Sequence, residues 1–98
     1  PELQRLGGRN YGVVGAGTGM GRQTCHALTQ AGAAKSVCVD IDEERAADIA
    51  QEIGIGIAWA GDVTKRADAR RLGEFAEERL GVIAGVVDIV GMARWASL

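Results

Sequence analysis

YGVVGAGTGMGR, residues 11–22, is the stretch that decides the fold of this chain. A short apolar run from Tyr11 to Val14 leads into a turn with four glycines in seven positions, and a helical pattern begins at once. Glycine allows positive φ and lets a backbone approach a ligand closely, while the N–H groups that start a helix attract phosphate. The order of strand, glycine turn and helix therefore predicts a dinucleotide-binding turn.

An acidic residue, Asp40, ends the next predicted strand and lies 19 positions after Gly21. This separation leaves room for a helix, a loop and a second strand, which places the carboxylate beside the glycine turn. There it would accept both hydroxyls of an unmodified ribose and repel a 2′-phosphate. The sequence therefore favours NAD over NADP.

Composition limits the class of protein. A chain of 98 residues with 47% apolar and 24% charged residues fits one small globular α/β domain. The formal net charge of −2 provides no cationic field for nucleic acid. The chain has no run of about 18 apolar residues and no apolar secretion signal near Pro1, so we expect a cytoplasmic protein that binds no membrane.

Apolar residues at helical spacing predict three amphipathic helices, each closed by a glycine. Their expected bounds are Met20 to Ala31 before Gly32, a helix from the N-cap Asp42 to Gly54, and a helix from the N-cap Thr64 to Gly81. Their expected inner faces are Gly21, Thr24, Cys25 and Leu28, then Ala46, Ile49, Ala50 and Ile53, then Leu72, Phe75, Ala76 and Leu80.

Four short apolar runs alternate with these helices and predict buried parallel strands. They are Tyr11 to Val14, Ser36 to Val39, Ile55 to Trp59 and Val86 to Val90. Right-handed crossovers then give a Rossmann-type, doubly wound parallel sheet of the α/β class, with strand order 3-2-1-4. The two cysteines, Cys25 and Cys38, fall inside a helix and a strand, so we expect buried apolar side chains and no metal site.

The glycine turn resembles that of the short-chain dehydrogenase/reductase family, T-G-x-x-x-G-x-G, with Val14 in place of the threonine. Asp62-Val63 resembles the family's Asp-Val pair, which holds the adenine. The resemblance, together with the residues above, implies NAD contacts from Gly15, Gly17, Thr18, Gly19, Met20, Gly21, Asp40, Ile41, Asp62, Val63, Val90 and Gly91.

The fourth strand departs from the family pattern. The family carries N-N-A-G there, and this chain carries Asp88-Ile89-Val90-Gly91, which keeps only the glycine. Backbone contacts from Val90 and Gly91 do not depend on side-chain identity, so they stay among the expected contacts.

Family chemistry uses a serine and a Tyr-x-x-x-Lys pair, and no residues here match them: the one tyrosine, Tyr11, lies on the first strand, and Ser97 comes too early. We therefore expect residues 1–98 to be the N-terminal, NAD(P)-binding portion of a longer oxidoreductase that transfers hydride between an alcohol and a carbonyl compound. The fourth strand would then be an open edge beside uncovered apolar surface, which predicts self-association of the isolated piece and a homo-oligomer for the enzyme.

Two other functions fit part of the pattern. Methyltransferases that use S-adenosylmethionine share a G-x-G-x-G loop, matched by residues 15–19, and acidic residues after strands 2 and 3, matched by Asp40 and Asp62. A non-catalytic module that senses or stores a dinucleotide would also need no catalytic residues. Titration with each ligand discriminates among the three hypotheses.

Overall fold

The computed structural model describes residues 7–91, in which four strands alternate with three helices. In chain order the elements are β1 (Asn10–Val14), α2 (Gly19–Gln30), β2 (Lys35–Asp40), α3 (Glu43–Ile53), β3 (Gly56–Ala60), α4 (Arg66–Leu80) and β4 (Gly85–Asp88). None of the helices in this range is long and apolar enough to cross a membrane. Pro1 and Ser97, on which two of the expectations rest, lie outside the described residues.

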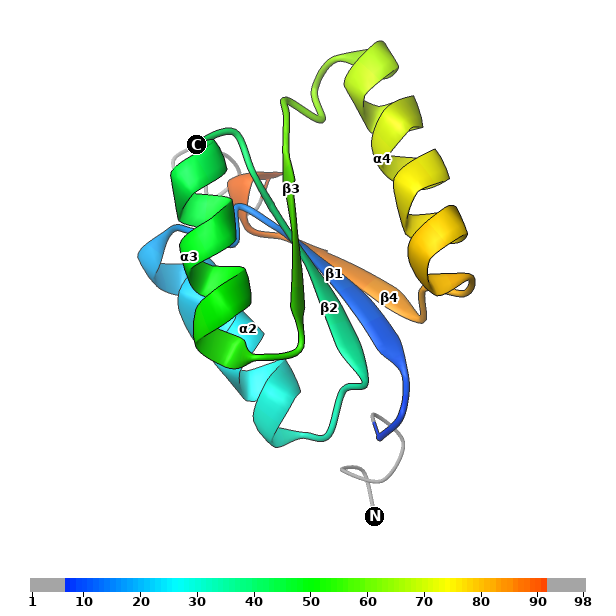
Figure 1. The fold of residues 1–98 in the computed structure, drawn as a ribbon. Coiled ribbons are helices and arrows are strands. Elements are labelled where there is room, and N and C mark those ends of the chain that lie inside the picture. Colours follow the sequence, from blue (N-terminus) through cyan, green and yellow to red (C-terminus); the bar gives the residue numbers. More distant parts are fainter. Residues whose placement is uncertain (1–6, 92–98) are drawn as a thin grey trace.

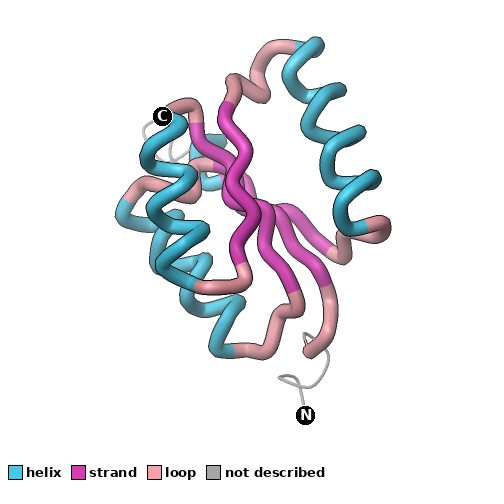
Figure 2. The backbone as a smooth tube through the Cα atoms, in the orientation of Figure 1, coloured by secondary structure: helices cyan, strands magenta, loops and turns pink. Residues whose placement is uncertain are grey.

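The strands form one parallel sheet in the order β3-β2-β1-β4, which confirms the predicted topology. Helices α2 and α3 cover one face of the sheet and α4 lies on the other (Figure 1). Because the strands are parallel, the loops that follow them leave the sheet at one edge, as the tube view shows (Figure 2). At this edge Val14 pairs with Val39 on one side and with Asp88 on the other.

The face under α2 and α3 carries the better-buried core. Val13, Cys25, Cys38 and Ile49 have no exposed surface there. The inner face predicted for α3 is confirmed, because all four of its residues are buried. Each buried aliphatic side chain contributes about 1.5–3 kcal/mol relative to an exposed one, so this layer holds the glycine turn and its helix on the sheet.

The opposite face is only partly covered. Val14, Val37 and Val39 are buried beneath α4, but no residue of α4 itself is buried. Its apolar residues Leu72 and Phe75 pack against this cluster while remaining half-exposed. The sheet therefore has one complete apolar layer and one incomplete one among the described residues.

The two cysteines behave as the sequence predicts. Cys25 on α2 and Cys38 on β2 are free thiols with no exposed surface, in the same core cluster. The neighbouring Cys25 thiol and burial raise the pKa of the Cys38 thiol, which donates a hydrogen bond to the carbonyl of Ser36. The Cys38 thiol therefore stays protonated at neutral pH and fills space as a small apolar side chain.

Several local predictions were wrong. The third and fourth strands were predicted to be buried, but neither β3 nor β4 contains a buried residue, because both lie at the edges of the sheet. The N-cap of α4 is Lys65, because both the N–H and the hydroxyl of Thr64 donate to the Asp62 carboxylate, within a turn closed by the bond from the Lys65 N–H to the Asp62 carbonyl. Strand β4 ends at Asp88, and residues 89–91 are helical, so Val90 is not a strand residue. On the predicted inner face of α2, Gly21 and Cys25 are buried and Leu28 packs against the core while partly exposed, whereas the Thr24 hydroxyl donates to the carbonyl of Met20.

Candidate functional site: a cavity at the carboxyl edge of the sheet

The glycine turn is held by its own backbone. The N–H groups of Gly15 and Ala16 both donate to the carbonyl oxygen of Val39, at 2.8 and 3.0 Å. Gly15 has φ +83°, a conformation that glycine adopts without strain. These bonds tie the end of β1 to the end of β2, so the turn is shaped before any ligand binds.

Thr18 is the N-cap of α2. Its hydroxyl accepts the N–H of Gly21 at 3.0 Å and donates to the carbonyl of Gly15 at 2.8 Å. Within residues 7–91 no hydrogen bond uses the N–H groups of Gly19 and Met20, which belong to the first turn of α2. Two free donors at the positive end of a helix form a site suited to phosphate.

Glycine suits positions 21 and 19 of the turn for different spatial reasons. A Cβ at Gly21 would overlap the carbonyl oxygen of Gly15, so this glycine allows α2 to pack against the turn. A Cβ at Gly19 would meet no atom within 4 Å. The space beside Gly19 is open, and a diphosphate can approach the helix start from that side.

Asp40 points at the glycine turn. Its residue is 6% exposed; Oδ2 accepts the N–H of Gly17 at 2.9 Å and Oδ1 accepts the N–H of Asp42 at 3.0 Å. A carboxylate offers about four acceptor sites. These two bonds fix the orientation of the group and leave acceptor capacity for the two hydroxyls of a ribose.

The loop after β3 forms another wall. The N–H and the hydroxyl of Thr64 both donate to Asp62 Oδ1, and these bonds hold the pKa of the Asp62 carboxyl below its usual range. The N–H of Asp62 donates to Asp68 Oδ2 on α4 at 2.9 Å. The loop is therefore fixed from within and from α4.

Asp88 closes the cavity beside β1. Its Oδ1 accepts the N–H of Gly91 at 2.8 Å, so the carboxylate caps the helical turn that follows β4. This contact explains why the chain leaves the strand at Asp88 and turns before Val90.

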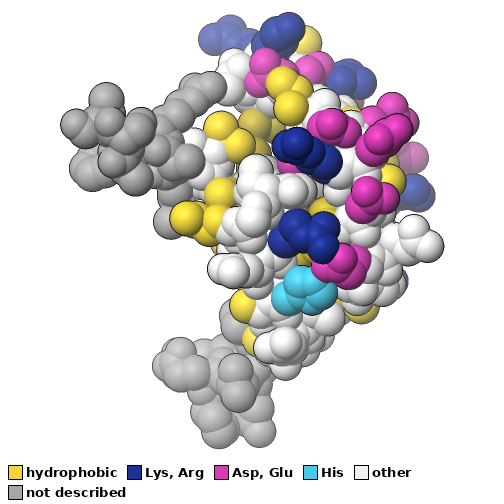
Figure 3. Space-filling view, turned by 90° about the vertical axis from the view of Figure 1, so that its left-hand side faces the viewer, with side chains coloured by type: hydrophobic (Ala, Val, Ile, Leu, Met, Phe, Trp, Pro, Cys, Tyr) yellow, Lys and Arg dark blue, Asp and Glu magenta, His cyan; other side chains and the backbone are white. Residues whose placement is uncertain are grey.

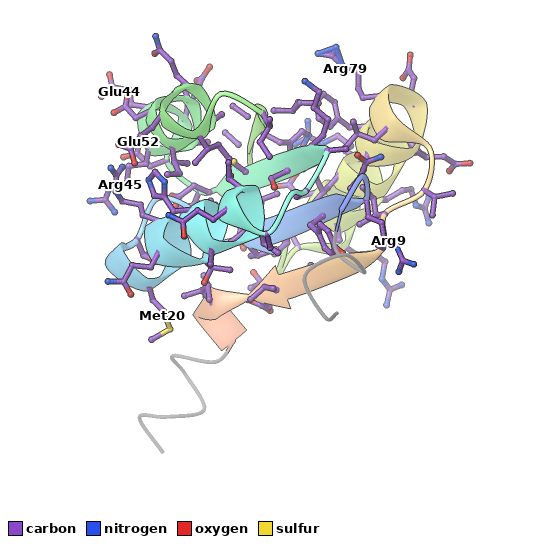
Figure 4. All side chains as sticks on the ribbon, turned by 90° about the horizontal axis from the view of Figure 1, so that it is seen from below. Arg9, Met20, Glu44, Arg45, Glu52 and Arg79 are labelled. Atoms are coloured by element: carbon purple, nitrogen blue, oxygen red, sulfur yellow. The ribbon has the colours of Figure 1, made fainter. Side chains whose placement is uncertain are left out.

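These loops enclose a cavity of about 280 Å³. Its wall includes eight of the twelve predicted contact residues: Gly15, Thr18, Asp40, Ile41, Asp62, Val63, Val90 and Gly91. The other four, Gly17, Gly19, Met20 and Gly21, are outside the wall, and Met20 projects from the molecule with 54% of its surface exposed (Figure 4). Ligand pockets are typically about 300–1,000 Å³, so this cavity is sized for part of a dinucleotide.

Six residues of the wall were not among the predicted contacts: Val14, Val39, Arg45, Gly61, Thr64 and Asp88. Most of these adjoin a predicted contact at the end of a strand, and that adjacency was the available signal. Arg45 lies on α3 and had no such signal, because an arginine on a polar helix face is usually solvated.

The charges on the wall are unequal. Three carboxylates, from Asp40, Asp62 and Asp88, line the cavity, and Arg45 is the one cation among the described wall residues. The Arg45 side chain is 63% exposed, with its nearest carboxylate on Asp42 at 3.9 Å. Figure 4 shows Arg45 on the α2/α3 side of the molecule, away from Arg9 and Arg79.

A separate ion cluster joins α2 to α3 outside the cavity. The Glu52 carboxylate bonds to both Arg22 and His26. These two contacts hold the pKa of the Glu52 carboxyl below its usual range, with the His26 hydrogen bond the larger cause. Basic, acidic and histidine side chains adjoin on this face (Figure 3), which indicates a structural link between the helices.

A parallel sheet with this strand order, a glycine turn and an acidic end of β2 defines the class of dinucleotide-binding folds. The family model for short chain dehydrogenases matches residues 10–97. The chain belongs to the short-chain dehydrogenase family.

Individual proteins are similar over the same region. A short chain dehydrogenase of Pseudocercospora fijiensis is 31% identical over 98 residues, which cover 96% of this chain and 31% of that protein. The structure of a hydroxysteroid dehydrogenase from Escherichia coli has a TM-score of 0.81 at 30% identity, covering 89% of this chain and 38% of that one.

A third similar structure is a 3-ketoacyl-(acyl-carrier-protein) reductase from Brucella melitensis complexed with NADH. Its TM-score is 0.78 at 34% identity, with 83% of this chain and 34% of that one covered. This chain thus spans about a third of the length of each of the three relatives.

Proposed function

We propose that this chain is the cofactor-binding portion of an NAD-dependent oxidoreductase that transfers hydride between an alcohol and a carbonyl compound. The observation that carries the proposal is the approach of Asp40 to the glycine turn at one cavity, with the free N–H groups of Gly19 and Met20 beside it. A diphosphate and a ribose of one dinucleotide would occupy these two places.

The residues present fit the adenosine half of NAD. The open space at Gly19 admits a phosphate, and Asp40 retains acceptor capacity for ribose hydroxyls. Asp62 and Val63 would hold the adenine, and the backbone at Val90 and Gly91 would contact the cofactor between β1 and β4. When bound, the nicotinamide ring would exchange the hydride with the substrate.

The NAD preference rests on charge. Asp40 would repel a 2′-phosphate, and two further carboxylates on the wall would add to this repulsion. The catalytic serine, tyrosine and lysine are proposed to come from sequence outside residues 1–98. The homo-oligomer and the cytoplasmic location remain predictions.

Calorimetric titration of the intact protein with NAD, NADP and S-adenosylmethionine tests the proposal. The expected result is binding of NAD, weaker binding of NADP and no binding of S-adenosylmethionine. Binding of S-adenosylmethionine without NAD would favour the methyltransferase hypothesis and overturn this one. Binding of NAD without hydride transfer in either direction, from an alcohol to NAD or from NADH to a carbonyl compound, would favour the sensor module.

A further inference from the structure

The wall formed by residues 61–64 is fixed by a side chain outside the cavity. Asp68, on the first turn of α4, accepts the N–H of Asp62 on Oδ2 at 2.9 Å. This backbone bond is the largest cause that holds the pKa of the Asp68 carboxyl below its usual range. Asp68 does not line the cavity, but its Oδ2 contacts two wall residues, through the bond from the Asp62 N–H and the approach to Gly61. Its effect on a ligand would therefore act through the loop of residues 61–64.

Asp68 is itself held in place. Its Oδ1 accepts a hydrogen bond from Arg71 Nη2 at 2.9 Å, and the Arg71 guanidinium lies over the Trp59 ring, 5.3 Å from its centre. Trp59 in turn packs against Gly61, where a Cβ would lie 2.5 Å from the ring. Helix α4 and the end of β3 therefore hold Asp68 and the loop in one arrangement.

This arrangement orients one hydrogen-bond acceptor, the Oδ2 atom of Asp62. Both Thr64 bonds go to Asp62 Oδ1, and within the described residues Oδ2 of Asp62 accepts no hydrogen bond. A carboxylate oxygen accepts a donor and repels an acceptor. Adenine presents an amino group, a donor, where hypoxanthine presents a carbonyl oxygen, an acceptor.

We propose that Asp68 is a positioning residue that sets the preference of this cavity for adenine, by fixing the backbone of Asp62 so that its carboxylate accepts the adenine amino group. The proposal rests on the proposed NAD site. It assigns to α4 a role in choosing the base as well as in covering the sheet.

The test compares the affinities of the intact protein for NAD and for nicotinamide hypoxanthine dinucleotide, which differ in that one group. The wild type should bind NAD at least about tenfold more tightly, as expected for one charge-assisted hydrogen bond. Asp68→Ala should reduce the ratio of the two affinities to about threefold or less, chiefly by weakening NAD. Asp68→Asn should keep most of the ratio, because its amide oxygen still accepts the Asp62 N–H.

Glu74→Ala is the matched control, since it removes an exposed carboxylate from the same helix away from the cavity. The ratio of its affinities for NAD and the hypoxanthine analogue should equal that of the wild type. If Asp68→Ala does not fold, Arg71→Gln replaces it, and a reduced ratio is again expected.

Two results would overturn the inference while NAD binding persists: a wild type that does not distinguish the two ligands, or an unchanged ratio of affinities in Asp68→Ala or its replacement, which includes an equal loss of both affinities. A wild type that binds neither ligand would instead overturn the proposed function.

Discussion

The N–H of Gly17 donates to Asp40 Oδ2 at 2.9 Å, which joins the glycine turn after β1 to the carboxylate that ends β2. Arg45 packs over this contact, since a Cβ at Gly17 would lie 2.5 Å from Arg45 Cβ and 2.8 Å from Asp40 Oδ2. Asp40 is therefore part of the turn's own structure as well as a group that faces the cavity.

This double role determines what substitution of Asp40 should do. Asp40→Ala should lower the affinity for NAD about tenfold to a hundredfold, because lost charge-assisted hydrogen bonds are worth roughly 1.5–3 kcal/mol each. It should also reduce the preference of the protein for NAD over NADP. Asp40→Asn keeps an acceptor for the Gly17 N–H, so its NAD affinity should lie between those of the wild type and Asp40→Ala. Calorimetric affinities for both cofactors provide the measurement, and an unchanged NAD/NADP ratio in Asp40→Ala would refute the assignment.

Two glycines of the turn should respond differently to alanine. Gly21→Ala should destabilise the fold by about 1–3 kcal/mol, because its Cβ overlaps the Gly15 carbonyl oxygen. Gly19→Ala should leave stability unchanged or raise it by up to about 1 kcal/mol, since alanine favours a helix. It should nevertheless weaken NAD, because the new methyl group occupies the approach to the helix start. Urea unfolding and NAD titration test both variants, and equal stability of the two would contradict the packing argument.

Arg45 should support binding through its charge. It is the one cation among the described residues of an otherwise acidic wall, and a dinucleotide is an anion. Arg45→Gln should weaken NAD about threefold to fivefold, or about 0.7–1 kcal/mol, as expected for an exposed ion pair. The difference should shrink as salt is added. Arg70→Gln removes the same charge from an exposed site on α4 and should have no effect; an equal effect would mean that only net charge matters.

The Glu52 cluster should make stability depend on pH. Its carboxyl pKa is lowered by His26 and Arg22, so the stabilisation is present above the ordinary carboxyl pKa and is lost as pH falls through the lowered value. Glu52→Gln should therefore melt at a lower temperature than the wild type at about pH 7, and the difference should disappear towards about pH 3. A difference that stays constant across this range would show that the contacts contribute packing alone.

The strand order and the helix that follows Asp42 could be predicted from the sequence because their signals are local. Asp42 caps α3 by accepting the N–H groups of Glu44 and Arg45, and the apolar spacing behind it has one interpretation. The crossover rule leaves a handful of orders for four parallel strands, and 3-2-1-4 is the Rossmann-type order that accompanies a dinucleotide-binding turn.

The start of α4 and the end of β4 are set by the hydrogen bonds that the carboxylates of Asp62 and Asp88 accept. Thr64 is the better N-cap by residue type, because the Lys65 side chain has no acceptor, but both the N–H and the hydroxyl of Thr64 donate to the Asp62 carboxylate and the helix begins one residue later. The Asp88 carboxylate likewise caps the helical turn that follows β4. The apolar residues Ile89 and Val90 in that turn look, in sequence alone, like a continuation of the strand. Arg45 reaches the cavity only because α3 packs beside Gly17, a contact between residues 28 positions apart.

Binding of NAD at the glycine turn is best tested by NMR, by following the backbone amide signals of the intact, ¹⁵N-labelled protein as NAD is added. We expect the largest shifts at Gly19 and Met20, whose N–H groups would bind the diphosphate, with further shifts at Gly17 and Ile41 around the Asp40 carboxylate. Saturation with NAD that leaves these four signals in place would contradict it.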